Sequence, residues 1–260
     1  MSVQDDSLKE NEGGIGETIK VIIQALLLAL VVRTLLFQPF SIPSGSMKST
    51  LLIGDYLFVS KYSYGYSKYS LPFGLPLFSG RVMASEPTRG DIVVFKLPRD
   101  PSVDYIKRVI GLPGDKIQMI DGQLYINGTA VEHERIDDFV DTDERGNKTR
   151  VERYKETLPN GVSYTTLNLT DSNYLDNTPV YEVPANHYFM MGDNRDNSSD
   201  SRVLSNVGYV PFENLVGKAQ VIFFSIGDGK APWEIWSWPS SARWERWFTS
   251  LKPDMSGEDK

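Results

Sequence analysis

The sequence lacks cysteine altogether and has little histidine, with only His133 and His187 among its 260 residues. Without cysteine, disulfides, thiol nucleophiles and cysteine-ligated zinc sites are excluded, which is compatible with an oxidising compartment. Two histidines are too few for a three-histidine metal site. Any mechanism that needs a histidine base has to use one of these two residues.

Positive charge and the motifs of several enzyme classes are also scarce. The net charge is −7, from 27 Lys and Arg against 34 Asp and Glu, which argues against nucleic acid as the main partner. There is no His-Glu-x-x-His and no Gly-x-Ser-x-Gly. The acidic stretch DNRDNSSDSRVL, from Asp193, lacks the glycine and glutamate of an EF-hand calcium loop. We therefore expect no metal ion and no other cofactor.

One long apolar run, TIKVIIQALLLALVVRTLLF, covers residues 18–37. A helix needs about 20 mostly apolar residues to cross a bilayer, and Arg33 lies near one end, where its side chain can reach the headgroups. The acidic tail and the missing Ala-x-Ala exit argue against a cleaved signal peptide; a buried core helix is the remaining alternative. We predict a tail over 1–17 and an uncleaved anchor over 18–37. Lysine and arginine are too evenly distributed around this run to orient it.

The rest of the chain has the pattern of short strands. Segments such as DYLFVSKYSY, GDIVVFKLP and HYFMMGDN combine β-branched and aromatic residues, and Asn127-Gly128 predicts a hairpin turn. No long amphipathic helix interrupts them, so we predict a mostly β fold with an antiparallel sheet. The more polar residues of the middle region predict an inserted smaller β subdomain. The predicted divisions are a β core over 38–125 and 186–230, the insertion over 126–185, and a C-terminal segment over 231–260.

Aromatic residues gather in residues 61–80 and in the C-terminal segment, which contains all five tryptophans. Trp244, Trp247, Phe248 and Leu251 follow the i, i+3, i+4, i+7 spacing of one helical face. Two interpretations stay open. The aromatic side chains either cover the β core or lie at a membrane–water interface, which Trp and Tyr favour.

Nucleophilic catalysis by a serine requires a base that takes its proton. A Ser-His-Asp triad has no local support, since His187 lies in an apolar run and His133 in the polar insertion. A lysine base must be neutral, and the ordinary lysine pKa of ~10.4 leaves under ~0.1% neutral at pH 7 unless burial lowers it. Lys107, in the middle of the predicted strand DYIKRVIG, suits such burial, although a solvated lysine is more usual. Lys48 is the rival by proximity to Ser46, but its polar neighbours do not indicate burial.

Four segments, in order, resemble bacterial type I signal peptidase, a family of membrane-anchored serine proteases with a Ser/Lys dyad. SIPSGSM, with the following TLLIGDYLFVSKYSYG, is similar to the nucleophile segment, and RGDIVVFKLP to the next strand. DYIKRVIGLPGD is similar to the lysine segment and MGDNRDNSSDSR to the last family box. The resemblance covers most of residues 38–125 and 186–220, and residues 126–185 correspond only to the family's variable subdomain.

The resemblance implies roles for the matching residues. Ser46 would be the nucleophile and Lys107 the neutral base, and the Ser46 N–H and Ser44 hydroxyl would form the oxyanion hole. Ser198 would hydrogen-bond the lysine amine, beside a supporting ion pair of Asp200 and Arg202. The other polar residues of this box read as turn residues that satisfy backbone groups, namely Asp193, Asn194, Arg195 and Asn197.

The resemblance also implies a substrate, the signal peptides of exported preproteins, with small side chains at −1 and −3 of an Ala-x-Ala site. The peptide would bind as an added extended strand. The protein would be a single-pass protein of the bacterial inner membrane, with its tail in the cytoplasm and its catalytic domain on the outer face. The matching pocket positions are Phe40, Ile42, Pro43, Met47, Leu51, Leu57, Val94, Asp104, Tyr105 and Ile106.

The sequence differs from the family pattern next to the nucleophile, and two other functions remain as hypotheses. Where the family commonly has proline after Ser-Met-x, this chain has Ser49, preceded by Lys48. A self-cleaving Ser/Lys regulator of similar β fold is a second hypothesis, which the anchor and the lack of a helix-turn-helix disfavour. A non-catalytic, membrane-tethered binding module is a third, which the presence of Ser46, Lys107 and Ser198 disfavours.

Overall fold

The computed structural model describes residues 15–71, 74, 78–142, 147–170, 172–227 and 229–255. Most of the predicted tail, residues 1–14, therefore lies outside the described residues, as does part of the aromatic segment 61–80. The fold is mostly antiparallel β, preceded by one long apolar helix, as the sequence predicts.

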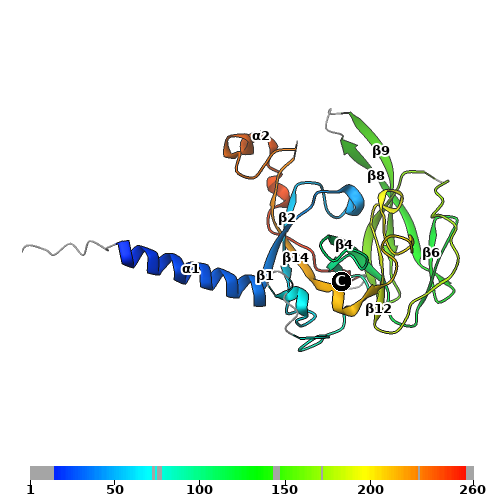
Figure 1. Cartoon of the computed structure of the whole chain (residues 1–260). Coiled ribbons are helices and arrows are strands. Elements are labelled where there is room, and N and C mark those ends of the chain that lie inside the picture. The colour runs from blue at the N-terminus through cyan, green and yellow to red at the C-terminus, as the bar shows by residue number, and fades with distance from the viewer. Residues whose placement is uncertain are drawn as a thin grey trace, which may run out of the picture.

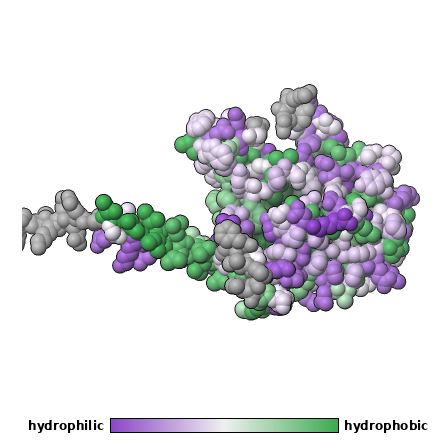
Figure 2. Space-filling view, in the orientation of Figure 1, coloured by the Kyte–Doolittle hydropathy of each residue, from purple (hydrophilic) through white to green (hydrophobic). Residues whose placement is uncertain are grey.

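The apolar helix α1 (Ile15–Leu35) extends away from the β body and buries none of its residues against it (Figure 1). Its surface is almost entirely hydrophobic in Figure 2, except near its first turns. At ~1.5 Å per residue it is long enough to cross a hydrocarbon core of ~30 Å. The helix begins three residues earlier and ends two residues earlier than predicted, because Phe37 already pairs with Ser60 in the first sheet.

A large antiparallel sheet carries most of the β body, in the order β1-β2-β14-β3-β4-β12-β13, with β15 paired to β14. Apolar side chains alternate or run continuously along these strands, which buries both faces of the central ones. The sheet contains every strand predicted for the core between residues 37 and 111 and after residue 186. Its strands are β1 (Phe37–Ser41), β2 (Asp55–Ser60), β3 (Ile92–Lys96), β4 (Asp104–Gly111), β12 (His187–Met191), β13 (Val210–Pro211), β14 (Leu215–Ser225) and β15 (Thr249–Ser250).

Two four-stranded sheets complete the body, in the orders β16-β10-β9-β8 and β11-β5-β6-β7. Ile117 and Leu124 share one buried cluster with Val162 of the insertion and Phe189 of the large sheet. β5 and β6, which precede the predicted boundary at residue 126, therefore pack against both the large sheet and the insertion. The strands are β5 (Lys116–Ile120), β6 (Gln123–Ile126), β7 (Thr129–Ala130), β8 (Glu132–Thr142), β9 (Lys148–Thr157), β10 (Val162–Asn168), β11 (Tyr181–Glu182) and β16 (Asp254–Met255).

The predicted Asn127-Gly128 turn is confirmed. Both residues have positive φ angles, of 53° and 79°, and Ile126 pairs with Thr129 across the turn. Two consecutive positive φ angles are typical of a type I′ hairpin turn, which favours Asn-Gly.

The helix predicted from the Trp244–Leu251 spacing is wrong. The segment forms a single 3-10 turn, η7 (Trp244–Arg246), and Phe248 adopts a φ of 59°, which ends any helix. The backbone then pairs as β15 with β14, and Leu251 enters a buried cluster. Pairing with the sheet edge and burial of Leu251 thus override the local helical spacing.

Some tryptophans cover the β core, and others are exposed to the surroundings. Trp238 and Trp247 pack on Phe224, with ring centroids 5.1 and 4.9 Å away, whereas Trp233 and Trp236 are 75% exposed. The remaining helical turns are short: α2 (Trp238–Ser241), η1 (Gly45–Met47), η2 (Lys68–Ser70), η4 (Arg195–Asn197), η5 (Phe212–Asn214) and η6 (Ile235–Ser237).

Candidate active site

Ser46 lies in the 3-10 turn η1, directly after β1 and the exit of α1. The turn is held from across the site, because Asn194 donates its backbone N–H to the Ser46 carbonyl at 3.1 Å and its side-chain amide to Gly45 O at 3.0 Å. The Ser44 hydroxyl lies 3.4 Å from Ser46 Oγ. Ser46 is thereby kept at the wall of a cavity while its backbone is fixed.

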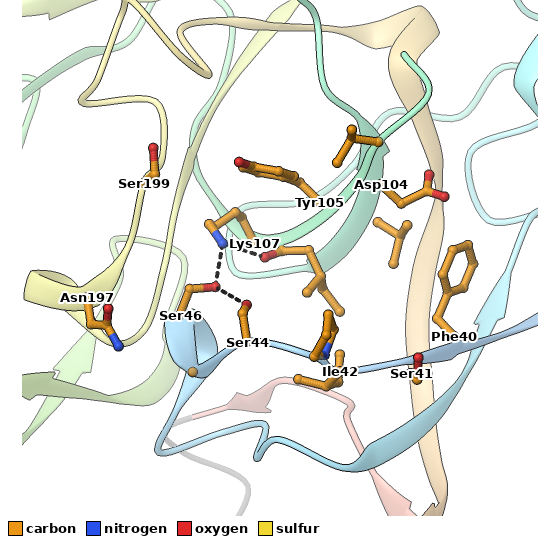
Figure 3. A pocket seen from close by; sticks show the side chains of 15 residues that line it. Phe40, Ser41, Ile42, Ser44, Ser46, Asp104, Tyr105, Lys107, Asn197 and Ser199 are labelled. Carbon is orange, nitrogen blue, oxygen red and sulfur yellow. Dashed lines mark hydrogen bonds between the residues drawn. The ribbon is translucent and has the colours of Figure 1, made fainter. Parts of the chain in front are cut away.

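Lys107 reaches Ser46 from β4, although the two residues are 61 positions apart in the chain. Lys107 Nζ lies 2.6 Å from Ser46 Oγ and donates to Ile106 O at 3.0 Å (Figure 3). The Lys107 side chain extends over the Tyr105 ring, with Nζ 5.4 Å from the ring centroid. This contact follows from the predicted alternation, which places Tyr105 and Lys107 on one face of the strand.

The environment of Lys107 lowers its pKa below the ordinary lysine value. The residue is 3% exposed, and burial lowers the pKa of Lys107 to about 8, against the opposing charges of Asp200 and Asp193. Arg202 adds to the decrease. A pKa near 8 leaves about a tenth of the lysine neutral at pH 7, far more than in water.

The last family-like box surrounds the lysine with paired charges. Asp200 and Arg202 form the expected buried ion pair, at 2.9 Å, and Asp200 Oδ2 accepts the Gly192 N–H at 3.0 Å. The pairing with Arg202 and the bond from Gly192 offset the burial of Asp200, whose pKa is lowered. The aspartate therefore stays ionised close to Lys107.

The hydrogen bond expected between Ser198 and Lys107 is not made. Ser198 Oγ is buried without a hydrogen-bond partner, while Lys107 Nζ is directed at Ser46 and at Ile106 O. Ser198 packs so closely on Gly192 that a Cβ there would lie 2.2 Å from Ser198 Oγ. This close packing, which only glycine permits, positions Ser198 against the turn beside Ser46.

Asp193 and Arg195 are not the backbone-satisfying turn residues that the sequence suggests. Asp193 forms a buried ion pair with Arg108, at 2.6 Å. Arg195 makes two bonds to Glu156 of β9, at 2.7 and 2.6 Å, and Tyr164 donates to the same carboxylate. A buried charge without a partner is costly, so breaking either pair would destabilise the fold. The two ion pairs therefore hold the segment from Asp193 to Arg195 against β4 and against the insertion. Asn194 does satisfy backbone groups, as expected.

A cavity of about 520 Å³ opens beside Ser46 and Lys107. Figure 3 shows Ser46 between Ser44 and Lys107 at one end, with Phe40 and Asp104 at the other. Seven of the ten predicted pocket positions line it: Phe40, Ile42, Pro43, Val94, Asp104, Tyr105 and Ile106. Sequence reasoning missed five further lining residues, namely Ser41, Gly45, Val103, Asn197 and Ser199.

Met47, Leu51 and Leu57 do not line this cavity, which corrects their prediction as pocket residues. All three are fully buried in one apolar cluster with Ile42 and Val94. The cluster lies behind the cavity wall, so their role is to support Ile42 and Val94. The alternation of apolar residues could not separate the wall from the layer behind it.

Lys48 and Ser49 tie the nucleophile turn to the insertion. Lys48 Nζ lies 2.7 Å from both carboxylate oxygens of Asp141 on β8, and Ser49 Oγ donates to Thr165 O on β10 at 2.9 Å. Ser49 has a φ of 83°, which proline cannot adopt because its ring holds φ near about −65°. The turn after Ser46 therefore differs from the proline-containing turn that the resemblance implied.

Neither histidine lines the cavity. His133 packs on the Tyr154 ring, with centroids 4.1 Å apart, and His187 Nδ1 lies 2.8 Å from Ala185 O. In the part of the chain that the structure describes, no group of three or more His, Asp or Glu side chains is placed to hold a metal ion.

The comparisons by sequence point to one family. The family model of signal peptidase, peptidase S26, matches residues 15–224. The chain is 48% identical to signal peptidase I of Rickettsia typhi over 241 residues, 86% of this chain and 89% of that protein. It is 47% identical to signal peptidase I of Rickettsia felis, over 86% of this chain and 88% of that protein. The crystal structure of a signal peptidase I from Enterococcus faecalis shares 29% identity over 52% of this chain and 97% of that chain, with a TM-score of 0.30.

Proposed function

Because the chain belongs to the signal peptidase family, peptidase family S26, we propose that Ser46 and Lys107 are the dyad with which it cleaves signal peptides from preproteins. Family membership itself makes it a serine endopeptidase, signal peptidase I. The observation that carries the dyad is the 2.6 Å separation between Ser46 Oγ and Lys107 Nζ, with the lysine buried. Other candidate bases are less suitable, since Lys48 is paired with Asp141.

In the proposed reaction, neutral Lys107 accepts the proton of the Ser46 hydroxyl as Oγ attacks the scissile carbonyl carbon. The C–N bond then breaks, and the lysine gives the proton to the departing amine of the mature protein. A water molecule, deprotonated by the same lysine, then attacks the ester carbonyl on Ser46. The bond to Ser46 Oγ breaks, the signal peptide leaves as a carboxylic acid, and the lysine returns the proton to Ser46 Oγ. The lowered pKa of Lys107, about 8, supports these proton transfers near neutral pH.

The negative charge that develops on the carbonyl oxygen requires hydrogen-bond donors on the nucleophile's side of the cavity. We assign this role to the Ser46 N–H and the Ser44 hydroxyl, which lies 3.4 Å from Ser46 Oγ. The bonds from Asn194 to the Gly45 and Ser46 carbonyls support this assignment, because they fix the turn that carries both donors. Donors fixed in advance stabilise the transition state without further reorganisation.

The proposed specificity is for small side chains at −1 and −3, the Ala-x-Ala rule. Ile42, Val94 and Ile106 give the cavity apolar walls, supported by the buried layer behind them. β1 is the last strand at its end of the large sheet, so an extended substrate can add beside it through backbone hydrogen bonds. Such binding tolerates varied sequences and leaves selection to the small pockets.

We propose that α1 is a single membrane anchor and that the β body lies on the outer face of the bacterial inner membrane. The helix has the length and composition of a membrane span, and the site follows it after about ten residues. The scissile bond of a signal peptide also emerges at the membrane surface, so the anchor keeps enzyme and substrate together.

The test is cleavage of a purified preprotein by the full-length protein and by Ser46→Ala. We expect cleavage after a small residue by the wild type and none above background by the variant. Undiminished cleavage by Ser46→Ala would refute the dyad. Cleavage of the enzyme's own chain alone would instead favour the self-cleaving regulator.

A further inference from the structure

A second cavity, of about 620 Å³, lies where α1 joins the β body. Its walls come from the end of α1, from β1, and from the residues around η2 and β3. The junction is firmly made, because Tyr66 Oη donates to Leu35 O at 2.8 Å and the Lys61 N–H donates to Leu36 O at 3.0 Å. This size falls within the usual range for small-molecule sites, about 300–1,000 Å³.

Positive charge dominates the walls of this cavity. Arg33, Lys61 and Lys96 line it, against the single carboxylate of Asp104. Lys96 pairs with Asp104 at 2.9 Å, which leaves Arg33 and Lys61 without a carboxylate partner among the described residues. The cavity therefore carries two uncompensated cations.

Lys61 is the more unusual of the two. It is 3% exposed, and its ammonium group donates to only one protein acceptor in the described chain, Ser70 O at 2.8 Å. An ammonium has three donors, so burial leaves it under-satisfied. Burial and the nearby charge of Arg33 lower the pKa of Lys61 to about 8. A bound anion would satisfy the free donors and relieve this repulsion.

The position of the cavity identifies the anion. Arg33 lies 18 residues after Ile15, the first residue of α1, which is about 27 Å along a helix and close to the ~30 Å thickness of a hydrocarbon core. The charged headgroups of a bilayer begin at this depth. An anion delivered at that level, beside an anchor helix, is the phosphate of a membrane lipid.

We propose that Arg33 and Lys61 bind the phosphate of an anionic lipid headgroup at the junction of the anchor and the catalytic body. The proposal rests on the membrane anchoring of α1. Arg33 approaches the phosphate from the helix and Lys61 from the end of β2. The lipid would fix the angle between α1 and the body, and with it the height of Ser46 above the membrane.

The experiment measures lipid retention by the full-length protein in mixed micelles, by native mass spectrometry and without substrate. The micelles contain phosphatidylglycerol or phosphatidylcholine in an uncharged detergent. We expect the wild type to retain phosphatidylglycerol preferentially. Arg33→Gln and Lys61→Met should each lower that retention about fivefold, the factor expected for one interfacial cation.

Two further variants serve as controls. Lys116→Met removes the same charge from an exposed position in the far sheet and should retain as much lipid as the wild type. Lys61→Arg keeps the charge and should restore most of the retention, which separates charge from a failure to fold. Preprotein cleavage by Arg33→Gln in the same micelles shows that the dyad is intact.

Several results would overturn the proposal. Equal retention by the wild type, Arg33→Gln and Lys61→Met would remove its basis. Binding of inorganic phosphate with no preference between the two lipids would make the cavity a site for free phosphate. Lipid binding that appears only with added signal peptide would assign the cavity to the substrate. If no variant associates with micelles, Lys116→Met included, the anchoring of α1 fails as well.

Discussion

Lys107 and Lys61 are two lysines that are equally inaccessible to solvent but have different hydrogen-bond partners. Lys107 and Lys61 are each 3% exposed, and burial lowers the pKa of both to about 8. Lys107 Nζ lies 2.6 Å from a serine hydroxyl, whereas the one hydrogen bond of Lys61 Nζ within the described chain goes to a backbone carbonyl, Ser70 O. Burial is the main cause of the lowered pKa of both lysines, and a hydroxyl within hydrogen-bond reach gives a neutral lysine a proton to take.

Lys48 completes the comparison as a lysine of a third kind. It stands two residues from Ser46 in the sequence, yet its ammonium group is paired with Asp141 and partly exposed. Proximity in the sequence is thus a poor guide to the base, and the partner of each ammonium decides its role.

The largest expected effect separates Lys107 from Lys61. Lys107→Met should lower kcat for preprotein cleavage by at least about 10³-fold, as should Ser46→Ala. Each variant removes one member of a dyad whose two residues act together. The matched change Lys61→Met should cost less than about tenfold, since in the described chain Lys61 Nζ donates to the backbone carbonyl of Ser70 and to no serine hydroxyl. Steady-state cleavage of one preprotein by the three variants measures this, and similar losses for both lysine variants would remove the distinction.

A smaller loss of kcat is expected when the Ser44 hydroxyl, beside the nucleophile, is removed. Ser44→Ala should lower kcat by about 10²–10³-fold with little change in KM, because an oxyanion donor acts mainly in the transition state. Kinetics with a soluble signal-peptide substrate separate the two parameters. A change confined to KM would show that Ser44 contributes to substrate binding instead.

The pH profile tests whether Lys107 acts in its neutral form. Its pKa is lowered to about 8, so kcat/KM should level off above that pH and fall about tenfold per pH unit below it. The sign follows because protonation removes the lone pair that accepts the serine proton. The measurement uses a substrate without titrating groups near the cleavage site. Activity that stays constant from pH 6 to pH 8 would contradict a lysine base.

The smallest effect is expected at Lys48. Lys48→Met breaks a partly exposed ion pair, which typically contributes ~1 kcal/mol or less, so we expect only a few-fold change in kcat and a small shift in the urea midpoint. Asp141→Asn breaks the same pair from the other side and should behave alike. A loss as large as that of Lys107→Met would reinstate Lys48 as the base.

Much of the architecture could be predicted from local sequence patterns. The length of the apolar run predicts α1, and short apolar segments between turns predict the strands of the large sheet. The helix predicted around Trp244 failed because pairing of β15 with β14 outweighs a local spacing. The cluster that joins Ile117 and Leu124 to Val162 of the insertion was likewise not evident from the sequence, because its members come from distant strands.

The sequence suggested which residues could form the candidate site, but it did not show which side chains contact one another there. Ser46 and Lys107 followed from resemblance together with the need for a buried base. The role of Met47, Leu51 and Leu57 behind the cavity wall did not follow, because apolar residues look alike in a sequence. Nor did the ion pairs of Asp193 and Arg195, whose partners come from distant strands.

The sequence by itself determined an apolar helix of membrane length, a β body and a short set of serines and lysines able to react. Each of these depends on residue types within a few positions. Only the tertiary structure decided which lysine meets a serine hydroxyl, because Lys107 and Ser46 come together from positions 61 residues apart. It also buried Lys61 against the carbonyl of Ser70, with no hydroxyl bonded to its ammonium group among the described residues. Burial and partners are properties of the packed chain, and they set both the pKa of a lysine and the use to which it is put.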